Sequence, residues 1–210
     1  MQDNNNYMEQ NIMTVNGRGV VTAVPDTAVI RLGVETTGDN LASIQADNAR
    51  TSQAVLQALK QMGIRDIKTV EYSINKIFDT EDGRRVDKGY SVRNIFEIRM
   101  TNMGMVGSVI DTAVNQGANV VDFINFEVSD SDQYYLQALN LAVMNAYEKA
   151  HSITDTLDIS LNTVPKRITE NSFAPIPMRS SAMRELAFAT PVEPGSKQIE
   201  ANVTVEFLYR

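Results

Sequence analysis

Two glycines, Gly17 and Gly19, have a spacing that could cradle a phosphate group. They lie in TVNGRGVVTAVPDTAVIRLGVET, residues 14–36. A dinucleotide-binding loop needs a third glycine and then a helix whose N-terminus faces the ligand. Here threonine takes the third position, and residues 13–23 alternate between two faces, which predicts a β-strand. Glycines inside a strand indicate a bulge, a bend or the close approach of another backbone.

Other residues of chemical interest lack the partners that catalysis or metal binding requires. His151 is the only histidine and falls in a predicted helix, where we expect a structural role. Asp79, Glu81, Asp82 and Asp87 cluster around a predicted hairpin, but their spacing does not match a calcium loop and indicates a solvated turn. The chain has no cysteine, which excludes disulfides, thiolate nucleophiles and cysteine-ligated metals. We therefore predict no catalytic residue, no metal, no cofactor and no enzymatic activity. The rival hypothesis of a hydrolase would need carboxylates with perturbed pKa values in a cleft.

The composition narrows the class of partner. The 210 residues carry a formal net charge of -7, which argues against a nucleic-acid partner, because phosphates are bound through Lys and Arg. No stretch approaches the roughly 20 apolar residues of a membrane span. The polar start MQDNNNYMEQN lacks the features of a signal peptide, and we expect residues 1–11 to form a disordered tail. The chain as given is expected in the cytoplasm, or in the periplasm or outside the cell if a signal peptide was removed.

Hydrophobic periodicity predicts seven strands and three helices in the order β-β-α-β-β-α-β-α-β-β. Strands are expected at residues 13–23, 27–35, 67–79, 90–100, 120–129, 163–171 and 197–209, and helices within 38–64, 102–119 and 131–157. The first two strands are expected to form an antiparallel pair around the Pro25–Asp26 corner. This pattern predicts an α+β fold, with largely antiparallel sheet or sheets and the three helices on one face.

Two patterns bear on how these elements pack. In the strand at 67–79, one face is expected to carry Val70, Tyr72, Ile74 and Phe78. The helix at 131–157 is expected to pack closely through a stripe rich in alanine, consisting of Tyr135, Ala138, Leu139, Ala142, Ala146, Ala150 and Ile153. We predict a single domain over residues 12–210, although the length also fits two small joined domains.

Residues 172–196 fit neither helical nor strand periodicity and are rich in proline and methionine. Such a long loop in a compact domain is usually functional or disordered. Its apolar side chains are too many to reach one core and predict an interaction surface; a plain surface loop is the alternative. The six candidate interaction residues are Phe173, Ile176, Met178, Met183, Leu186 and Phe188.

Several segments together resemble the SIMPL-domain family over nearly all of residues 12–209. They are ITVNGRGVVTAVPDTAVIRLGVET (with Met13 inserted after Ile12), YSVRNIFEIRM, AVNQGANVVDFINFEVSD and APIPM…TPVEPGSKQIEANVTVEF. The resemblance implies an α+β fold shared with bacterial periplasmic immunogenic and oxidative-stress-related proteins, and with an animal protein that binds a receptor-associated kinase. It also implies that some members assemble into large hollow oligomers, and it supplies no catalytic or cofactor residues.

We therefore predict a non-enzymatic interaction or scaffold protein that self-associates as a homo-oligomer, with a protein partner as a further option. The resemblance links this function to cell-envelope or oxidative-stress protection. Strand edges and the 172–196 loop are expected to supply the contacts. The alternative is a binding module for a small ligand or envelope component, in a groove between helices and sheet.

Overall fold

The computed structural model describes residues 11–81, 83–171 and 192–210. All six candidate interaction residues of the 172–196 loop, and all but one residue of the predicted 1–11 tail, lie outside this part of the chain. The contacts divide the chain into two compact units. Unit 1 contains residues 11–24, 130–171 and 196–210, and unit 2 contains residues 25–129 and 192–195.

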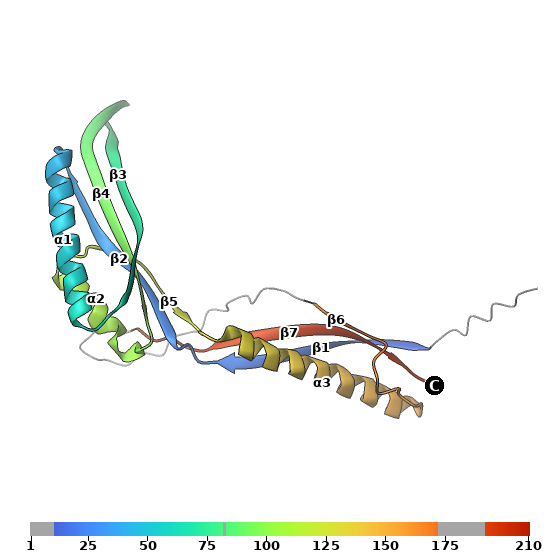
Figure 1. The fold of residues 1–210 in the computed structure, drawn as a ribbon. Coiled ribbons are helices and arrows are strands. Elements are labelled where there is room, and N and C mark those ends of the chain that lie inside the picture. The colour runs from blue at the N-terminus through green and yellow to red at the C-terminus, as the bar shows by residue number, and fades with distance from the viewer. Residues whose placement is uncertain (1–10, 82, 172–191) are drawn as a thin grey trace, which may run out of the picture. The chain divides into compact units, whose positions relative to one another are not determined.

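The predicted α+β class and order of elements are confirmed, with one short 3-10 helix, η1, in addition (Figure 1). The elements are β1 (Ile12–Ala23), β2 (Thr27–Gly38), α1 (Leu41–Gln61), β3 (Asp66–Glu81), β4 (Arg84–Met100), η1 (Met103–Met105), α2 (Val106–Asn115), β5 (Val120–Glu127), α3 (Ser131–Leu157), β6 (Arg167–Glu170) and β7 (Lys197–Leu208).

Unit 1 is a three-stranded antiparallel sheet in the order β1-β7-β6, with α3 packed on one face. β1 pairs with β7 along its whole length, from Ile12 opposite Leu208 to Ala23 opposite Lys197. The expected pairing of β1 with β2 is therefore wrong, because the two strands belong to different sheets. Alternation along a strand determines which residues share a face, but it does not determine which strand lies alongside.

The glycine pair lets the backbone of α3 approach β1 closely. A Cβ atom at Gly17 would lie 1.9 Å from the carbonyl oxygen of Ala142, and one at Gly19 would lie 1.9 Å from that of Ala138. The middle of a helix thus lies against the pair, and the sequence-based interpretation as a strand with a close backbone approach is confirmed.

The buried face of α3 recurs at every fourth residue. Ala138, Ala142, Ala146 and Ala150 are fully buried, as predicted, and the series continues to Thr154. The prediction that Ile153 points inward is wrong, since this side chain is 40% exposed. The Thr154 hydroxyl is satisfied inside the helix, where it donates to the carbonyl oxygen of Ala150 at 3.1 Å.

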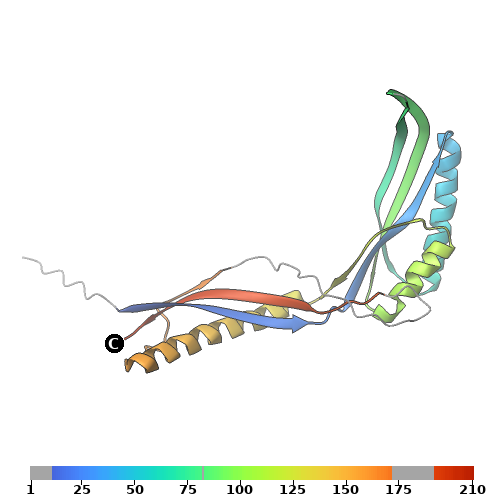
Figure 2. The same ribbon diagram turned by 180° about the vertical axis from the view of Figure 1, so that it is seen from behind.

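Unit 2 is a four-stranded antiparallel sheet in the order β3-β4-β2-β5, with α1 and α2 on one face (Figures 1 and 2). The side chains of β2 that face the helices are fully or almost fully buried, and they form one core with side chains of α1 and α2. This core includes Ala28, Ile30, Leu32, Val34, Val55, Leu59, Val106, Val109, Ile110 and Ala113. Asn40 caps the start of α1, because its side chain accepts a hydrogen bond from the Ser43 amide at 3.0 Å.

A buried asparagine fastens α1 to the sheet of unit 2. The Asn48 side chain donates to the carbonyl oxygens of Val34 at 3.0 Å and Val92 at 2.9 Å, and thus contacts both β2 and β4. Its own oxygen accepts from the Ser52 hydroxyl at 3.3 Å. Burying an amide is costly unless it is hydrogen-bonded, so this position requires the full set of partners.

Candidate interaction surfaces

β3 is an edge strand, hydrogen-bonded in its sheet only to β4. It is 16 residues long, and Figure 1 shows that the β3–β4 hairpin continues beyond the N-terminal end of α1. Its exposed large hydrophobic side chains are Val70 (42%), Tyr72 (51%), Ile74 (41%) and Phe78 (41%). An exposed edge presents unpaired backbone N–H and C=O groups, and a long apolar edge is a template for pairing with another strand.

The register of β3 against β4 shifts twice, between Thr69 and Glu71 and between Lys76 and Phe78. The first shift leaves Val70 without an opposing residue on β4, and the expectation that it shares a face with Tyr72, Ile74 and Phe78 stays a prediction. Bulges of this kind interrupt an edge. Between the shifts, residues 71–76 form an uninterrupted ladder, with Ile74 opposite the buried Val92.

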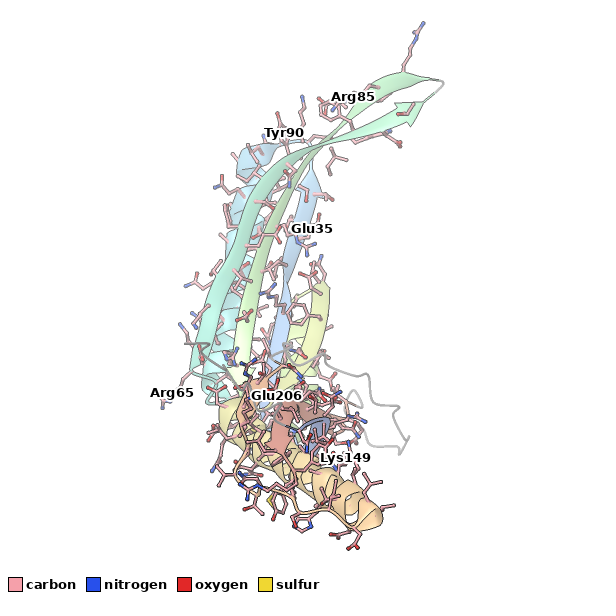
Figure 3. The ribbon with its side chains drawn as sticks, turned by 90° about the vertical axis from the view of Figure 1, so that its right-hand side faces the viewer. Glu35, Arg65, Arg85, Tyr90, Lys149 and Glu206 are labelled. Atoms are coloured by element: carbon pink, nitrogen blue, oxygen red, sulfur yellow. The ribbon has the colours of Figure 1, made fainter. Side chains whose placement is uncertain are left out.

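The end of the hairpin holds a cluster of cationic and aromatic side chains. The Arg85 guanidinium lies 3.6 Å from the centroid of the Phe78 ring, and the Lys76 ammonium lies 5.5 Å from it and 5.6 Å from that of Tyr90 (Figure 3). Lys76 also bonds Asp87 at 2.7 Å, and this contact is the main cause of a lowered pKa at Asp87. Asp87 is therefore held by a lysine, and it lies within β4 rather than in a turn.

The edge of unit 1 at β1 is occupied by side chains of α3. The Asn145 side-chain oxygen accepts from the backbone N–H of Arg18 at 3.2 Å. The Lys149 ammonium donates to the carbonyl oxygen of Asn16 at 2.8 Å (Figure 3). A backbone donor and a backbone acceptor of this edge strand are thus already bonded, which blocks an incoming strand at these positions.

The second edge of the unit 2 sheet is β5, which has eight residues. Val121 is 44% exposed and Phe123 is 38% exposed on this strand. The Arg31 guanidinium covers the Phe123 ring at 4.8 Å from its centroid. β5 is therefore a shorter edge strand than β3. The Val121 side chain on β5 is about as exposed as the Ile74 side chain on β3.

The sheet face opposite the helices of unit 2 carries paired charges. Arg93 contacts Asp122 at 2.5 Å, Glu71 at 3.3 Å and Glu35 at 3.5 Å, and the bond to Asp122 is the main cause of its raised pKa (Figure 3). Further ion pairs join Arg31 to Glu97 at 2.8 Å and Arg99 to Glu127 at 2.6 Å. These contacts are typical of a solvated sheet face.

A pocket of about 490 Å³ opens in unit 2 where α1 leads into β3 and where β4 leads into η1. Three methionines and an isoleucine supply its apolar side chains, with Arg65 among the charged ones (Figure 3). The lining residues are Thr27, Met62, Gly63, Ile64, Arg65, Asp66, Arg99, Met100, Thr101, Asn102 and Met105. Three carboxylates, Asp26, Asp87 and Glu200, have lowered pKa values, and none of the three lines this pocket.

His151 lies on the exposed side of α3, with Asp155 at 3.6 Å and the Tyr147 ring edge-on at a centroid distance of 5.2 Å. Over residues 11–81, 83–171 and 192–210, no group of three His, Asp or Glu side chains is arranged to hold a metal ion. Within the same ranges, no helix is both long and apolar enough to cross a membrane.

Comparison with protein families settles the relationship of the chain. Residues 13–207, which include most of both units, match the model of the SIMPL family, described as a protein of unknown function (DUF541). The chain belongs to the SIMPL family. It is 29% identical to the 26 kDa periplasmic immunogenic protein of Brucella melitensis, over 98% of this chain and 88% of that protein, and the Brucella abortus protein gives the same values. It is 25% identical to the uncharacterized protein YggE of Escherichia coli K12, over 79% of this chain and 69% of YggE.

Proposed function

We propose that this SIMPL protein is a non-enzymatic protein that self-associates, with the β3 edge pairing with the same edge of a second copy. The observation that carries the proposal is a 16-residue edge strand with Tyr72, Ile74 and Phe78 exposed. The β1 edge, by contrast, has backbone groups bonded by Asn145 and Lys149. Strand addition supplies main-chain hydrogen bonds for affinity, and alternate side chains for specificity.

Pairing of the β3 edges alone is expected to bury too little surface for a stable interface, so neighbouring residues must contribute. A stable interface buries on the order of 1,200 to 2,000 Å² in total. The uninterrupted segment at residues 71–76 is short, so the exposed ring of Phe78 and the hairpin around it are expected to contribute. The six residues of the 172–196 loop, which lie outside the described residues, stay a predicted second contact. Deleting residues 173–195 tests that prediction separately.

The relatives support a setting for this activity. The two Brucella proteins are named periplasmic, which favours a role for this chain in the cell envelope. A link to oxidative-stress protection rests on the family resemblance.

The titratable groups are compatible with a non-enzymatic role, because the lowered pKa values of Asp87 and Glu200 are caused mainly by their bonds to Lys76 and Arg18.

Sedimentation velocity over a range of protein concentrations tests the proposal with a matched pair of variants. Ile74→Lys places a charge on the β3 edge, where natural proteins use lysine to prevent pairing. Val121→Lys places the same charge on β5, at a side chain of similar exposure, 44% against 41%. We expect Ile74→Lys to shift the protein to monomer and Val121→Lys to sediment like the wild type. A wild-type protein that stays monomeric, or equal effects of the two variants, would contradict the proposal.

A second candidate function, binding of a small ligand, is favoured by the 490 Å³ pocket of unit 2. The pocket lies where helix and strand ends meet, and the sequence predicts a ligand groove between helices and sheet without naming its residues. A ligand bound only to the folded state raises the melting temperature according to its occupancy. A thermal-shift screen with the Met105→Lys variant as control distinguishes this function, because only pocket ligands should lose their effect in that variant.

A further inference from the structure

Four of the ten methionines come together at one end of unit 2. Met100, Met103 and Met105 follow the spacing Met-x-x-Met-x-Met in the sequence MTNMGM, and Met62 joins them from the end of α1. Met62, Met100 and Met105 all line the same pocket. Met103 packs against the same core as the other three.

The local structure explains why these side chains converge. Met62 is the C-cap residue of α1, which ends before Gly63 at a φ angle of +87°. Met100 is the last residue of β4, and Met105 is the last residue of η1. The chain therefore turns twice at the same end of the unit, and each turn brings methionine to the pocket lining.

These methionines pack in or against the core of unit 2, and three of them also line its pocket. Of the three methionines that line the pocket, Met100 is buried, while Met62 and Met105 are half-buried; Thr101 and Asn102 line the same pocket. Leucine would fill apolar space as well as methionine, but it has no sulfur. A thioether is a soft, neutral donor, and soft sulfur ligands select Cu(I) among biological metals.

The pocket lining carries two guanidiniums and one carboxylate. Arg99 is paired with Glu127 at 2.6 Å, and Asp66 lies 3.9 Å from the Lys68 ammonium. The lining thus holds no excess of carboxylates that would favour a hard divalent ion such as Mg²⁺ or Ca²⁺, which prefer oxygen ligands. A soft ion of charge +1 gains its binding energy from sulfur and needs little compensating charge.

We propose that Met62, Met100 and Met105 form a thioether site for a soft monovalent cation, Cu(I) or its analogue Ag(I). The site is independent of the self-association at β3, because none of its residues lies on that edge. Three neutral ligands from three separate elements would tie the ends of α1, β4 and η1 together when the ion is bound. Binding is expected to be insensitive to pH over the neutral range, since thioethers do not titrate.

The test is a calorimetric titration of the full chain with silver nitrate in chloride-free buffer. Few other side chains of this chain compete for Ag(I), because it contains no cysteine and a single histidine. The substitution His151→Gln removes that histidine and is included in every variant. We expect one Ag(I) ion per chain. The double variant Met62→Leu/Met105→Leu should bind Ag(I) at least about tenfold more weakly. Changes to residues that only support metal ligands already lower metal affinity by about 10- to 100-fold, and this variant removes two of the ligands themselves.

The matched control is Met13→Leu/Met144→Leu, which removes two methionines from unit 1 and should leave the affinity unchanged. Equal weakening in the two double variants, or no binding by the wild-type chain, would overturn the proposal. NMR of methyl-labelled methionines in the His151→Gln chain gives an answer even if a pocket variant fails to fold. The signals of Met62, Met100 and Met105 should shift on adding Ag(I), and shifts confined to other methionines would refute the site.

Discussion

Replacing Gly17 by alanine tests whether the glycine pair exists to admit the α3 backbone. The added methyl group would lie 1.9 Å from the Ala142 carbonyl oxygen and 2.9 Å from the Ala146 Cβ atom. A backbone carbonyl inside a helix cannot rotate away, so the helix itself has to move. It would have to retreat by about 1.1 Å before the shortest contact reaches 3.0 Å, the limit that real Cβ atoms respect.

That displacement sets the expected loss of stability. A gap of 0.5 to 1 Å already forfeits roughly a quarter to a half of the dispersion energy of a contact. The alanine stripe of α3 would lose such contacts along β1 and β7 together. Overpacking a well-filled core costs about 1 to 3 kcal/mol. The new Cβ atom would collide with a backbone carbonyl oxygen and a Cβ atom, neither of which can move by rotating a side chain. We therefore expect Gly17→Ala to destabilise unit 1 by about 3 kcal/mol, the upper end of this range.

Urea unfolding, followed by near-ultraviolet circular dichroism, measures this loss. Tyr147 contributes the signal of unit 1, because it packs edge-on against the buried Phe207 ring at a centroid distance of 6.3 Å, and Tyr72 and Tyr90 contribute the signal of unit 2. Gly104→Ala is the matched control, since a Cβ atom there would meet nothing closer than Asn102 Oδ1 at 3.6 Å. We expect the control to change stability by less than about 1 kcal/mol. If Gly17→Ala lowered the free energy of unfolding no more than this control, the reasoning about close approach would be refuted.

Three further perturbations follow from specific contacts. Asn48→Ala leaves two strand carbonyls without their donor and should cost about 2 kcal/mol in urea unfolding; an unchanged midpoint would contradict this. The pKa of Asp26 is lowered, chiefly by the hydroxyl and then by the N–H of Ser129. The resulting stabilisation is present above the ordinary pKa of 3.8 and is lost as the pH falls through the lower pKa of the folded state. Asp26→Asn should therefore make the urea midpoint less sensitive to acid below pH 3.8. An unchanged dependence of the midpoint on pH would argue against this. Asn145→Ala/Lys149→Ala frees backbone groups of β1 and should add association that Ile74→Lys does not remove, as measured by light scattering; unaltered scattering would show that these side chains do not guard the edge.

Hydrophobic periodicity predicts the helices and strands of this chain well, because each element buries one face against a core. The glycine pair is an example, since Gly17 and Gly19 continue the buried face of a strand. The spacing of four between buried alanines in α3 also stands in the sequence, and it points to Thr154 once the strict repeat is followed. The predicted stripe includes Ile153, which a strict repeat of four excludes.

Partners between distant segments could not be predicted in the same way. β1 lies beside β7, at the other end of the chain, and nothing in the alternation of either strand identifies the other. The edge position of β3 follows from the strand order β3-β4-β2-β5, which alternation does not reveal, so in the sequence its exposed side chains look like those of an ordinary half-buried strand. The contacts of Asn145 and Lys149 with β1 likewise need the folded geometry. The methionine spacing at residues 100–105 is visible in the sequence, but Met62 joins it only through the ends of α1 and β4.

Hydrogen–deuterium exchange of the backbone amides of β3, measured at increasing protein concentration, tests the association through this edge most directly. If β3 pairs with β3 of a second copy, amides within residues 71–76 that are open in the monomer will exchange more slowly as the concentration rises. Amides of β5 will not change. Association that leaves the exchange of β3 unaltered while slowing that of β5 or another segment would contradict the account.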